Sequence, residues 1–206
     1  MTPSLRNLKR NAAKNRTRRW RMLSVIIVVV ILSAMMVARN LLGNPGLQAA
    51  DPRLIDDRGR VIALLGEPLQ ATVLYFGYTH CIDNCPLALE HLVHARHALD
   101  KNRRAIRIAF VTVDPERDTP PVLQKFVQRF GDGITGYTGD ETQIETVLKD
   151  YHVWHQKIGE HPGTDAYLEA HSGGIFFVDA SGHIRKIADD EDSVEVLESD
   201  MNAIVP

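Results

Sequence analysis

Cysteine is almost absent from this chain of 206 residues: there are two, Cys81 and Cys85, and both lie in one five-residue window. A chain that keeps two thiols and places them together uses them as a unit. A small structural disulfide is the simplest alternative, but closing so short a loop stabilises a fold much less than closing a long one. The pair therefore indicates redox chemistry or metal binding.

Acidic side chains are absent from the first fifty residues, which hold nine basic ones. Those nine are Arg6, Lys9, Arg10, Lys14, Arg16, Arg18, Arg19, Arg21 and Arg39. Eight of them precede an uncharged apolar run over 22–38. As a helix rising ~1.5 Å per residue, this run reaches about 25 Å, the short end of what spans a bilayer. The positive-inside rule then predicts a basic cytoplasmic tail over 1–21 and a transmembrane anchor over 22–38.

No clear small-residue cleavage site follows Ala38, and no cysteine is present there to carry a lipid. An uncleaved anchor is therefore favoured over a signal peptide. We expect a bacterial inner-membrane protein with its soluble domain in the periplasm. The Arg-rich N-terminus leaves one alternative, the mitochondrial inner membrane with the domain facing the intermembrane space. In an oxidising compartment, two nearby thiols form a disulfide unless they are kept reduced or bound to a metal.

A surplus of basic charge is lacking beyond the anchor. Residues 39–50 have the glycines and proline typical of a linker, and 51–206 is long enough for one domain with a core of its own. Removing the nine N-terminal charges leaves 15 basic against 26 acidic residues in that domain, which argues against nucleic acid as a partner. Internal repeats and low-complexity tracts are also absent.

The cysteine window lies between a predicted strand and a predicted helix. The strand, over 71–77, is β-branched and aromatic, and Pro86 is suited to the first turn of a helix. A helix N-terminus carries unpaired N–H groups and a partial positive charge, which favour thiolate over thiol. A thiolate is both the nucleophile of disulfide exchange and a ligand for a soft metal.

Strands and helices alternate along the rest of the domain. We expect a hairpin at 53–64, strands at 71–77, 106–113, 134–137, 174–178 and 184–187, and helices at 86–99, 120–130, 140–151 and 193–202. A βαβ unit followed by a β-hairpin and a helix, with cysteines after the first strand of the unit, is the thioredoxin arrangement. The predicted fold class is therefore α/β and thioredoxin-like, with one N-terminal transmembrane helix.

Three segments together resemble one family. They are Gly77-Tyr-Thr-His-Cys-x-Asp-x-Cys-Pro86, Val111-Thr-Val-Asp-Pro-Glu-Arg-Asp-Thr-Pro120 and Asp165-Ala-Tyr-Leu-Glu-Ala-His171-Ser172. Over about residues 48–200 the chain resembles the Sco/SenC family of membrane-anchored copper proteins, which serve cytochrome c oxidase assembly. The resemblance implies a thioredoxin-like fold over 51–206 and one copper bound by Cys81, Cys85 and His171.

The residues themselves are compatible with copper. Cu(I) is soft and accepts two thiolates with an imidazole, which suits a site that must later release the ion. We expect both sulfurs to face one point across a turn, and His171 to begin the strand-hairpin segment that packs beside the cysteine loop. Departures from the family pattern are few: Ile82 stands where proline is common, and Gly173 and Gly174 predict a looser loop after the histidine.

The patterns of two related enzyme classes are missing. A thioredoxin-type redox enzyme usually has two residues between its cysteines and a cis-proline near the position of His171. This chain has three spacer residues and no proline in 169–172. Peroxiredoxins share a Pro-x-x-x-Thr-x-x-Cys pattern, which would need proline at Leu74 and threonine at Tyr78. Both classes are therefore disfavoured.

Two functions remain open. The first is a metallochaperone that carries copper, as Cu(I) or Cu(II), to the binuclear CuA centre of cytochrome c oxidase subunit II. The second is a thiol–disulfide oxidoreductase that reduces the cysteines of that centre so that another periplasmic copper carrier can load it. Only the second is an enzyme, and the sequence leaves this choice open. His171 separates the two functions, because copper needs a third ligand whereas disulfide exchange needs only the cysteines.

Other polar residues are interpreted as support or as solvent-facing. The segment Asp114–Pro120 ends a strand and starts a helix, with Asp118 or Thr119 as the helix cap, so we interpret it as structural support for the site. Asp83, between the cysteines, is expected to tune the site or receive a partner. Three histidines fall opposite the apolar face of their predicted helix, which favours solvent exposure over a second metal site: His91, His94 and His97. Three more are candidates for facing a partner: His152, His155 and His161.

Overall fold

The computed structural model describes residues 31, 33, 47–66, 70–99, 106–159 and 167–205. The chain divides into two compact units, Met1–Pro45 and Gly46–Pro206. In the first unit Ile31 and Ser33 are helical, while the predicted tail over 1–21 and the rest of the predicted anchor over 22–38 lie outside the described residues. Among the residues described, no helix combines the length and the apolar character needed to cross a membrane.

The second unit is built on a mixed eight-stranded sheet, in the order β1-β10-β9-β4-β5-β6-β2-β3. The strands are β1 (Leu47–Gln48), β2 (Arg53–Asp56), β3 (Val61–Ala63), β4 (Ala71–Gly77), β5 (Ile106–Thr112), β6 (Ile134–Thr138), β9 (Ile175–Val178) and β10 (His183–Ala188). The central strands β4, β5 and β6 are parallel, and β9 lies antiparallel to β4. The chain enters the sheet at residue 47, inside the expected linker over 39–50, because β1 pairs with the edge of β10.

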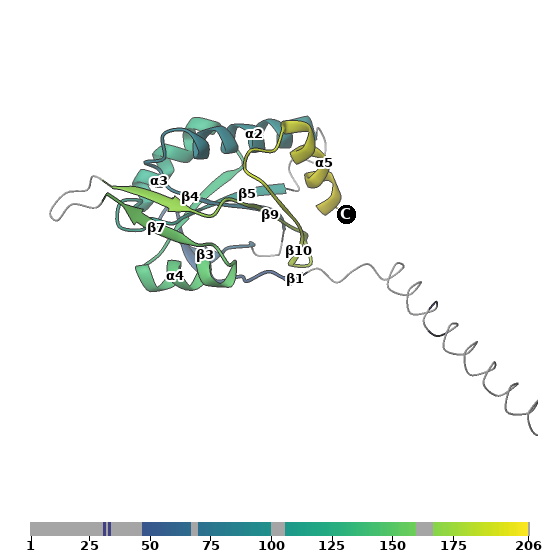
Figure 1. Ribbon diagram of the computed structural model, residues 1–206, viewed down its shortest axis with the longest axis horizontal. Helices are drawn as coiled ribbons and strands as arrows, with labels where there is room; N and C mark the ends of the chain where they lie inside the picture. The colour runs from purple at the N-terminus through teal and green to yellow at the C-terminus, as the bar shows by residue number, and fades with distance from the viewer. Residues whose placement is uncertain are drawn as a thin grey trace, which may run out of the picture. The chain divides into compact units, whose positions relative to one another are not determined.

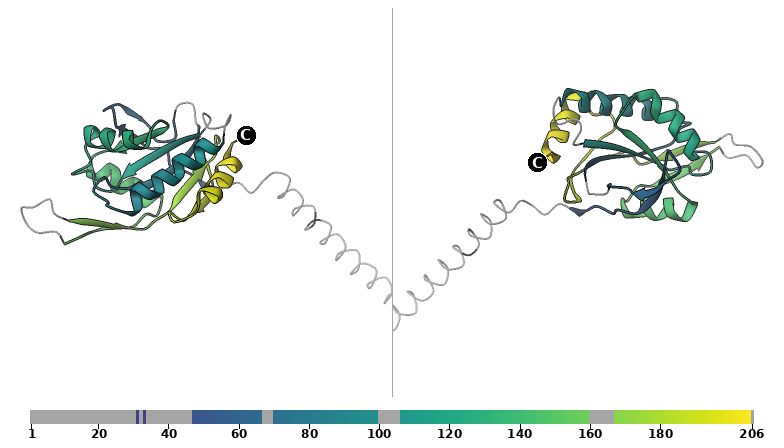
Figure 2. Two further views of the ribbon diagram at one scale, coloured as in Figure 1. Left: turned by 90° about the horizontal axis from the view of Figure 1, so that it is seen from above. Right: turned by 180° about the vertical axis from the view of Figure 1, so that it is seen from behind.

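Helices cover both faces of this sheet (Figures 1 and 2). On one face lie α2 (Asn84–Ala98), α3 (Pro120–Val127) and α5 (Val194–Ile204), and on the other lies α4 (Glu141–Asp150). α2 and α3 share a face because each joins neighbouring parallel strands by a right-handed crossover. A short 3-10 turn, η2 (Gln128–Phe130), extends α3. The start of α2 therefore lies at the carboxyl end of β4.

Strand β4 is the centre of the core, and all seven of its residues are buried. Successive side chains of a strand point to opposite faces of the sheet. The ring of Tyr75 accordingly lies 6.2 Å from that of Phe110. Phe76 instead packs against Phe176 and against Tyr151, at the end of α4, with centroids 5.7 and 5.4 Å apart. Aromatic packing on both faces gives the cysteine loop that follows β4 a rigid starting point.

The expected strands and helices are all present, with ends displaced by a residue or two. The structure adds a separate two-stranded ribbon, β7 (His155–Ile158) paired with β8 (Leu168–His171). This ribbon was not among the predicted elements, because its strands are short and mostly polar. His171 therefore ends β8 instead of beginning the β9–β10 segment, and that expectation was wrong. The ribbon crosses in front of the sheet (Figure 1).

Candidate metal centre

The two cysteines lie where the loop after β4 turns into α2. The turn is closed by the Cys81 N–H, which donates to the Tyr78 carbonyl at 3.3 Å, and by the Leu87 N–H, which donates to the Asp83 carbonyl at 3.4 Å. Cys81 is half-buried, and Cys85, in the first turn of α2, is fully buried. The Cys85 N–H donates to the Cys81 sulfur at 3.4 Å. As predicted, the helix N-terminus faces a sulfur.

Gly77, the last residue of β4, makes room for the buried sulfur. A Cβ at this position would lie 2.8 Å from Cys85 Sγ and 2.9 Å from Phe110 Cε2. Both distances are shorter than carbon tolerates, so any larger residue would displace the sulfur or the ring. The glycine of the motif is therefore required for the close approach of α2 to β4.

His171 meets the cysteines from the ribbon. Its Nε2 lies 3.9 Å from Cys85 Sγ, although 86 positions separate the two residues in the chain. Its ring stands edge-to-face on Tyr78, with centroids 6.3 Å apart. Nδ1 lies 3.2 Å from the Ser172 carbonyl oxygen. A proton on Nδ1 can be donated to that carbonyl, which leaves the Nε2 lone pair directed at the sulfurs.

The local structure explains why glycine occupies both positions after His171. Gly174 has φ +148°, a backbone conformation that favours glycine. A Cβ on Gly173 would lie 3.0 Å from a carboxylate oxygen of Asp190. The looser loop that the sequence suggested is instead a tight passage from β8 to β9 beside Asp190.

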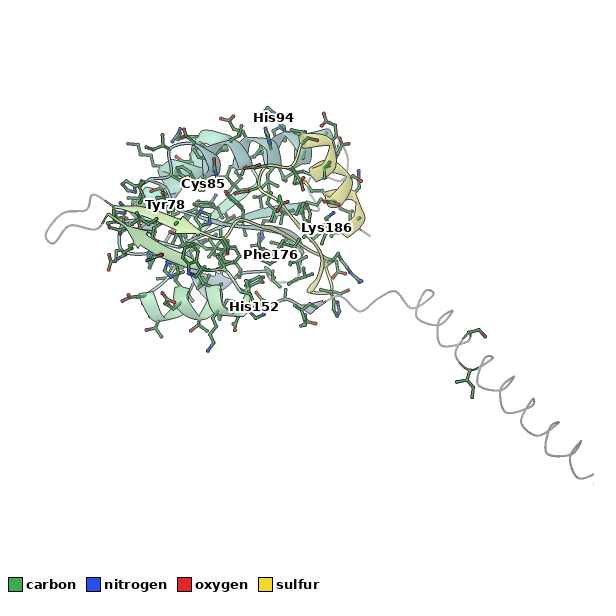
Figure 3. All side chains as sticks on the ribbon, in the orientation of Figure 1. Tyr78, Cys85, His94, His152, Phe176 and Lys186 are labelled. Atoms are coloured by element: carbon green, nitrogen blue, oxygen red, sulfur yellow. The ribbon has the colours of Figure 1, made fainter. Side chains whose placement is uncertain are left out.

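A hollow of about 390 Å³ opens in front of the site. It lies between the cysteine loop, with Cys81 and Ile82, and strand β8, with His171. Ile82, between the cysteines, is 81% exposed. Figure 3 shows Cys85 on α2 and Tyr78 beside it, at the end of the sheet. Cys81 thus lines the hollow, where another molecule can reach it, while Cys85 lies buried behind it.

The pKa values of the two thiols are shifted in opposite directions. The pKa of Cys81 is lowered to about 6, because the Cys85 thiol donates a hydrogen bond to its sulfur and backbone N–H groups of the turn point at it, against the effect of partial burial. The pKa of Cys85 is raised, because its proton is held between the two sulfurs and the side chain is buried. The reduced pair therefore carries one thiolate and one thiol near neutral pH.

The segment 114–118 supports the site, but not as a helix cap formed by Asp118. Thr119 is the N-cap of α3, and no side chain caps this helix. The buried Asp118 carboxylate instead accepts hydrogen bonds from the Thr79 N–H (3.0 Å), the Thr79 hydroxyl (2.5 Å) and the Thr112 hydroxyl (2.7 Å). It thereby ties the cysteine loop to the end of β5.

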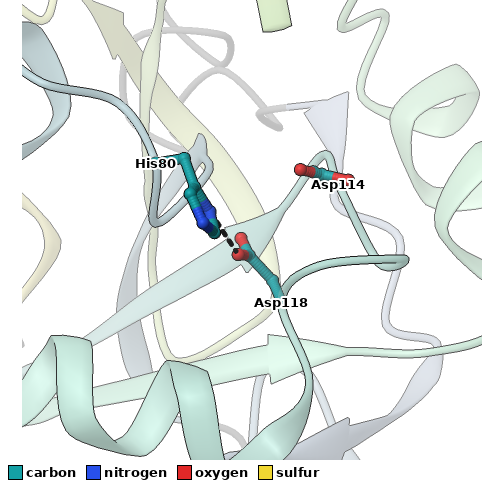
Figure 4. Close-up of side chains that lie close together, drawn as sticks. All are labelled: His80, Asp114 and Asp118. Carbon is teal, nitrogen blue, oxygen red and sulfur yellow. Dashed lines mark ion pairs between the residues drawn. The ribbon is translucent and has the colours of Figure 1, made fainter. Parts of the chain in front are cut away.

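His80, Asp114 and Asp118 lie close together (Figure 4), with one potential ligand atom from each within 4.8 Å of the others. Both carboxylates already accept hydrogen bonds: Asp118 from Thr79 and Thr112. Asp114 accepts them from Arg117 and Tyr167. We therefore assign no ion to this cluster. This agrees with the interpretation of the segment as support.

Of the three histidines expected on the solvent face of α2, two are exposed and one is half-buried. His94 and His97 are exposed on α2, and His91 is half-buried with Nδ1 3.3 Å from the Asp192 carbonyl oxygen. His155 lies between two glutamates, with Nε2 2.9 Å from Glu145 and Nδ1 3.5 Å from Glu169. His152 is exposed at the end of α4, with φ +55°. His161 lies outside the described residues.

Tyr75 and Asp190 are two site residues that were not predicted. The Tyr75 hydroxyl donates to Asp190 Oδ2 at 3.4 Å and also contacts the Cys85 thiol. Burial, with the neighbouring Cys85, raises the pKa of Tyr75, so its hydroxyl remains a hydrogen-bond donor. A tyrosine inside a wholly buried strand was a usable signal, because a buried hydroxyl needs a partner.

A mixed α/β sheet, a dithiol at the first helix after the central strand and an imidazole brought against it define a thioredoxin-like domain with a soft donor set. Comparison with known proteins gives the family. The family model described as SCO1/SenC matches residues 52–206. The chain therefore belongs to the SCO1/SenC family, as the resemblance had indicated.

Individual relatives agree with this assignment. A SCO2-like protein of Rickettsia felis is 30% identical over 149 residues, which are 72% of this chain and 73% of that protein. A mitochondrial SCO2 homolog of Bos taurus is 37% identical over 134 residues, 64% of this chain and 50% of that protein. The structure of Bradyrhizobium japonicum ScoI with copper bound matches with TM-score 0.67 and 28% identity, covering 76% of this chain and 99% of that one.

Proposed function

We propose that this chain is a membrane-anchored metallochaperone that binds copper through Cys81, Cys85 and His171 and delivers it to the CuA centre of cytochrome c oxidase subunit II. The convergence of two sulfurs and one imidazole nitrogen carries the proposal. These donors fit Cu(I), which prefers thiolates and accepts imidazole. The copper-bound relative, whose fold this chain shares, supports the same assignment.

Each residue has a distinct part in loading and release. Cys81 offers a thiolate at the mouth of the hollow, so it is the first donor that an incoming ion meets. Binding at Cys85 requires that its proton leave, since thiols bind metals in the deprotonated form. His171 supplies a neutral third donor from a separate element. Three donors with one open side allow the thiolates of a partner to replace them stepwise.

The reduced protein should bind one copper per chain, and the Cys81–Cys85 disulfide form should bind little. The physical reason is that the soft ligands are thiolates, and a disulfide removes both of them. Copper content after desalting, measured on matched reduced and oxidised samples, checks this expectation. Equal copper in the two forms would contradict the proposed ligand set.

A thiol–disulfide oxidoreductase is the second candidate, and the asymmetry of the thiols favours it. The accessible Cys81 thiolate can attack a disulfide of a partner, forming a mixed disulfide and releasing one partner thiolate. Cys85, which contacts Cys81, then attacks the Cys81 sulfur. The partner leaves with both its thiols reduced, and this chain leaves with a Cys81–Cys85 disulfide, which a dithiol donor must reduce again. Another copper carrier would then load the partner.

The proposed location is the bacterial inner membrane, with the domain in the periplasm; the mitochondrial inner membrane is the alternative, in line with the bovine relative. Tethering would raise the effective concentration of the domain near a membrane partner. Because basic residues precede the apolar run over 22–38, a reporter active only in the periplasm should be active when fused after Ala50. Activity from a cytoplasmic reporter at the same point would overturn this topology.

A further inference from the structure

One five-residue turn, 114–118, contacts both halves of the metal centre. It follows β5 and closes on itself, since the Asp118 N–H donates to the Asp114 carbonyl at 3.0 Å. The carboxylates of Asp114 and Asp118 are buried, at 1% and 0% exposure. Buried carboxylates keep a conformation only when their oxygens are hydrogen-bonded, because an unpaired buried acceptor is costly. The partners of the two carboxylates therefore show what the turn holds in place.

Asp118 holds the cysteine side. Its two oxygens accept bonds from the backbone and the hydroxyl of Thr79, two residues before Cys81, and from Thr112 at the end of β5. Figure 4 shows Asp118 directed at the loop that carries His80, the residue between Thr79 and Cys81. This one carboxylate thus fixes the position of the cysteine loop relative to β5.

Asp114 holds the histidine side, through Tyr167. The Tyr167 hydroxyl donates to Asp114 Oδ1 at 2.6 Å. Arg117, which is ion-paired with Asp114, stacks 3.5 Å from the centroid of the Tyr167 ring and donates to the Tyr167 carbonyl at 3.0 Å. Tyr167 directly precedes β8, the strand that ends in His171. The contacts of Asp114 and Arg117 with Tyr167 therefore fix the start of the strand that carries the His171 imidazole.

The other strand of the ribbon is attached to the same turn. Lys157 of β7 pairs with Glu116 at 2.7 Å and lies 4.9 Å from the centroid of the Tyr167 ring. β7 and β8 are in register, with His155 opposite His171. The ribbon can thus transmit a displacement at Tyr167 along β8, because all four residues of β8 are paired with β7.

We propose that the 114–118 turn sets the spacing between the sulfurs and the imidazole through two separable contacts: Asp118 positions the cysteine loop through Thr79, and Asp114 with Arg117 positions His171 through Tyr167. Asp114, Arg117, Asp118 and Tyr167 are then positioning residues that touch no ligand themselves. The inference rests on the proposed function for its copper readout, but its geometric content concerns the metal-free chain.

A matched set of variants in the full chain tests this division. Tyr167→Phe removes only the hydroxyl that donates to Asp114 and keeps the ring under Arg117. Thr79→Val removes the hydroxyl, which donates to Asp118 and lies 3.2 Å from His80 Nδ1, and keeps the backbone bond to Asp118. Tyr151→Phe is the control, because it deletes a buried tyrosine hydroxyl that donates to the Ala50 carbonyl at 2.6 Å, in another part of the fold.

Tyr167→Phe should weaken Cu(I) binding, measured against a competing chelator, by up to about 10-fold, the lower end of the effect of losing a direct partner of a ligand, because Tyr167 acts on His171 only through β8. In the metal-free protein it should shift the imidazole NMR signals of His171 and leave the amide signals of Cys81 and Cys85 unchanged. Thr79→Val should shift the cysteine amides and leave the His171 signals unchanged. Tyr151→Phe should change neither set and should bind copper like the unmodified chain.

If Tyr167→Phe leaves His171 and copper affinity unchanged, or if each variant disturbs both sets of signals equally, the two-contact proposal is wrong. A general loss of stability would appear as a lower melting temperature with both sets disturbed, and the control variant would share it. If the unmodified chain binds no copper, the proposed function fails, while the NMR pattern still decides the role of the turn.

Discussion

Replacing both thiols, in a Cys81→Ser/Cys85→Ser variant, should reduce copper binding from one ion per chain to none that survives desalting. Serine is close to cysteine in size, but its hydroxyl is a hard and weakly acidic donor that does not replace a thiolate toward Cu(I). His171 would be left as the only donor of the set, and one imidazole does not retain the ion. Copper content and the absorption of the copper-loaded protein measure the effect.

The control for this variant is His94→Ala, which removes an exposed histidine of α2 outside the site and should leave copper binding intact. Because Cys85 is fully buried, a serine there places a hydroxyl in the core. Cys81→Ser alone, at the half-buried position, is therefore the second variant, and circular dichroism reports whether each one folds. A folded double variant that still binds one copper would refute the site.

His171→Ala should separate the two candidate functions. Copper affinity should fall by more than about 100-fold, because losing even a residue that only supports a ligand costs about 10- to 100-fold. The rate at which a small disulfide oxidises Cys81 and Cys85 should stay nearly unchanged, since exchange depends on thiolate character and access. Chelator competition and stopped-flow oxidation, run on the same sample, give both numbers.

The consequence in cells follows from the same split. If copper delivery is the function, cells with His171→Ala should lose oxidase activity at low copper and recover part of it when copper is added. His94→Ala again serves as the control and should behave like the unmodified protein. Full oxidase activity with His171→Ala at low copper, together with its loss in either cysteine variant, would establish the reductase function and exclude the chaperone.

Much of the fold was predictable from local patterns. β4 is a buried run of seven residues, most of them apolar, and Pro86 and Pro120 are each suited to the first turn of a helix. The placement of Cys81 and Cys85 at a helix N-terminus follows from that strand and that helix alone. These features depend on residues near one another in the chain, so the sequence shows them directly.

The ribbon of β7 and β8 was not predictable in this way. Its strands are four residues each and mostly polar, and they pair only with each other. No buried run marks them, although Pro162-Gly163, between them in the sequence, is a turn signal. Their stability depends on contacts with distant residues such as Arg117, which stacks on Tyr167. For the same reason the sequence left Asp118 and Thr119 as alternative caps of α3: Thr119 occupies the cap position, while Asp118 holds Thr79.

By itself, the sequence determined the α/β class, the order of the elements, the dithiol at the start of α2 and the family to which the chain belongs. The tertiary structure alone decided that His171 reaches Cys85 from a ribbon, that Gly77 makes room for the buried sulfur, and that one turn contacts both halves of the site. The division has a physical cause. Secondary structure and helix starts follow from short-range sterics and hydrogen bonding, whereas the meeting of groups 86 positions apart depends on how the sheet and its ribbon pack.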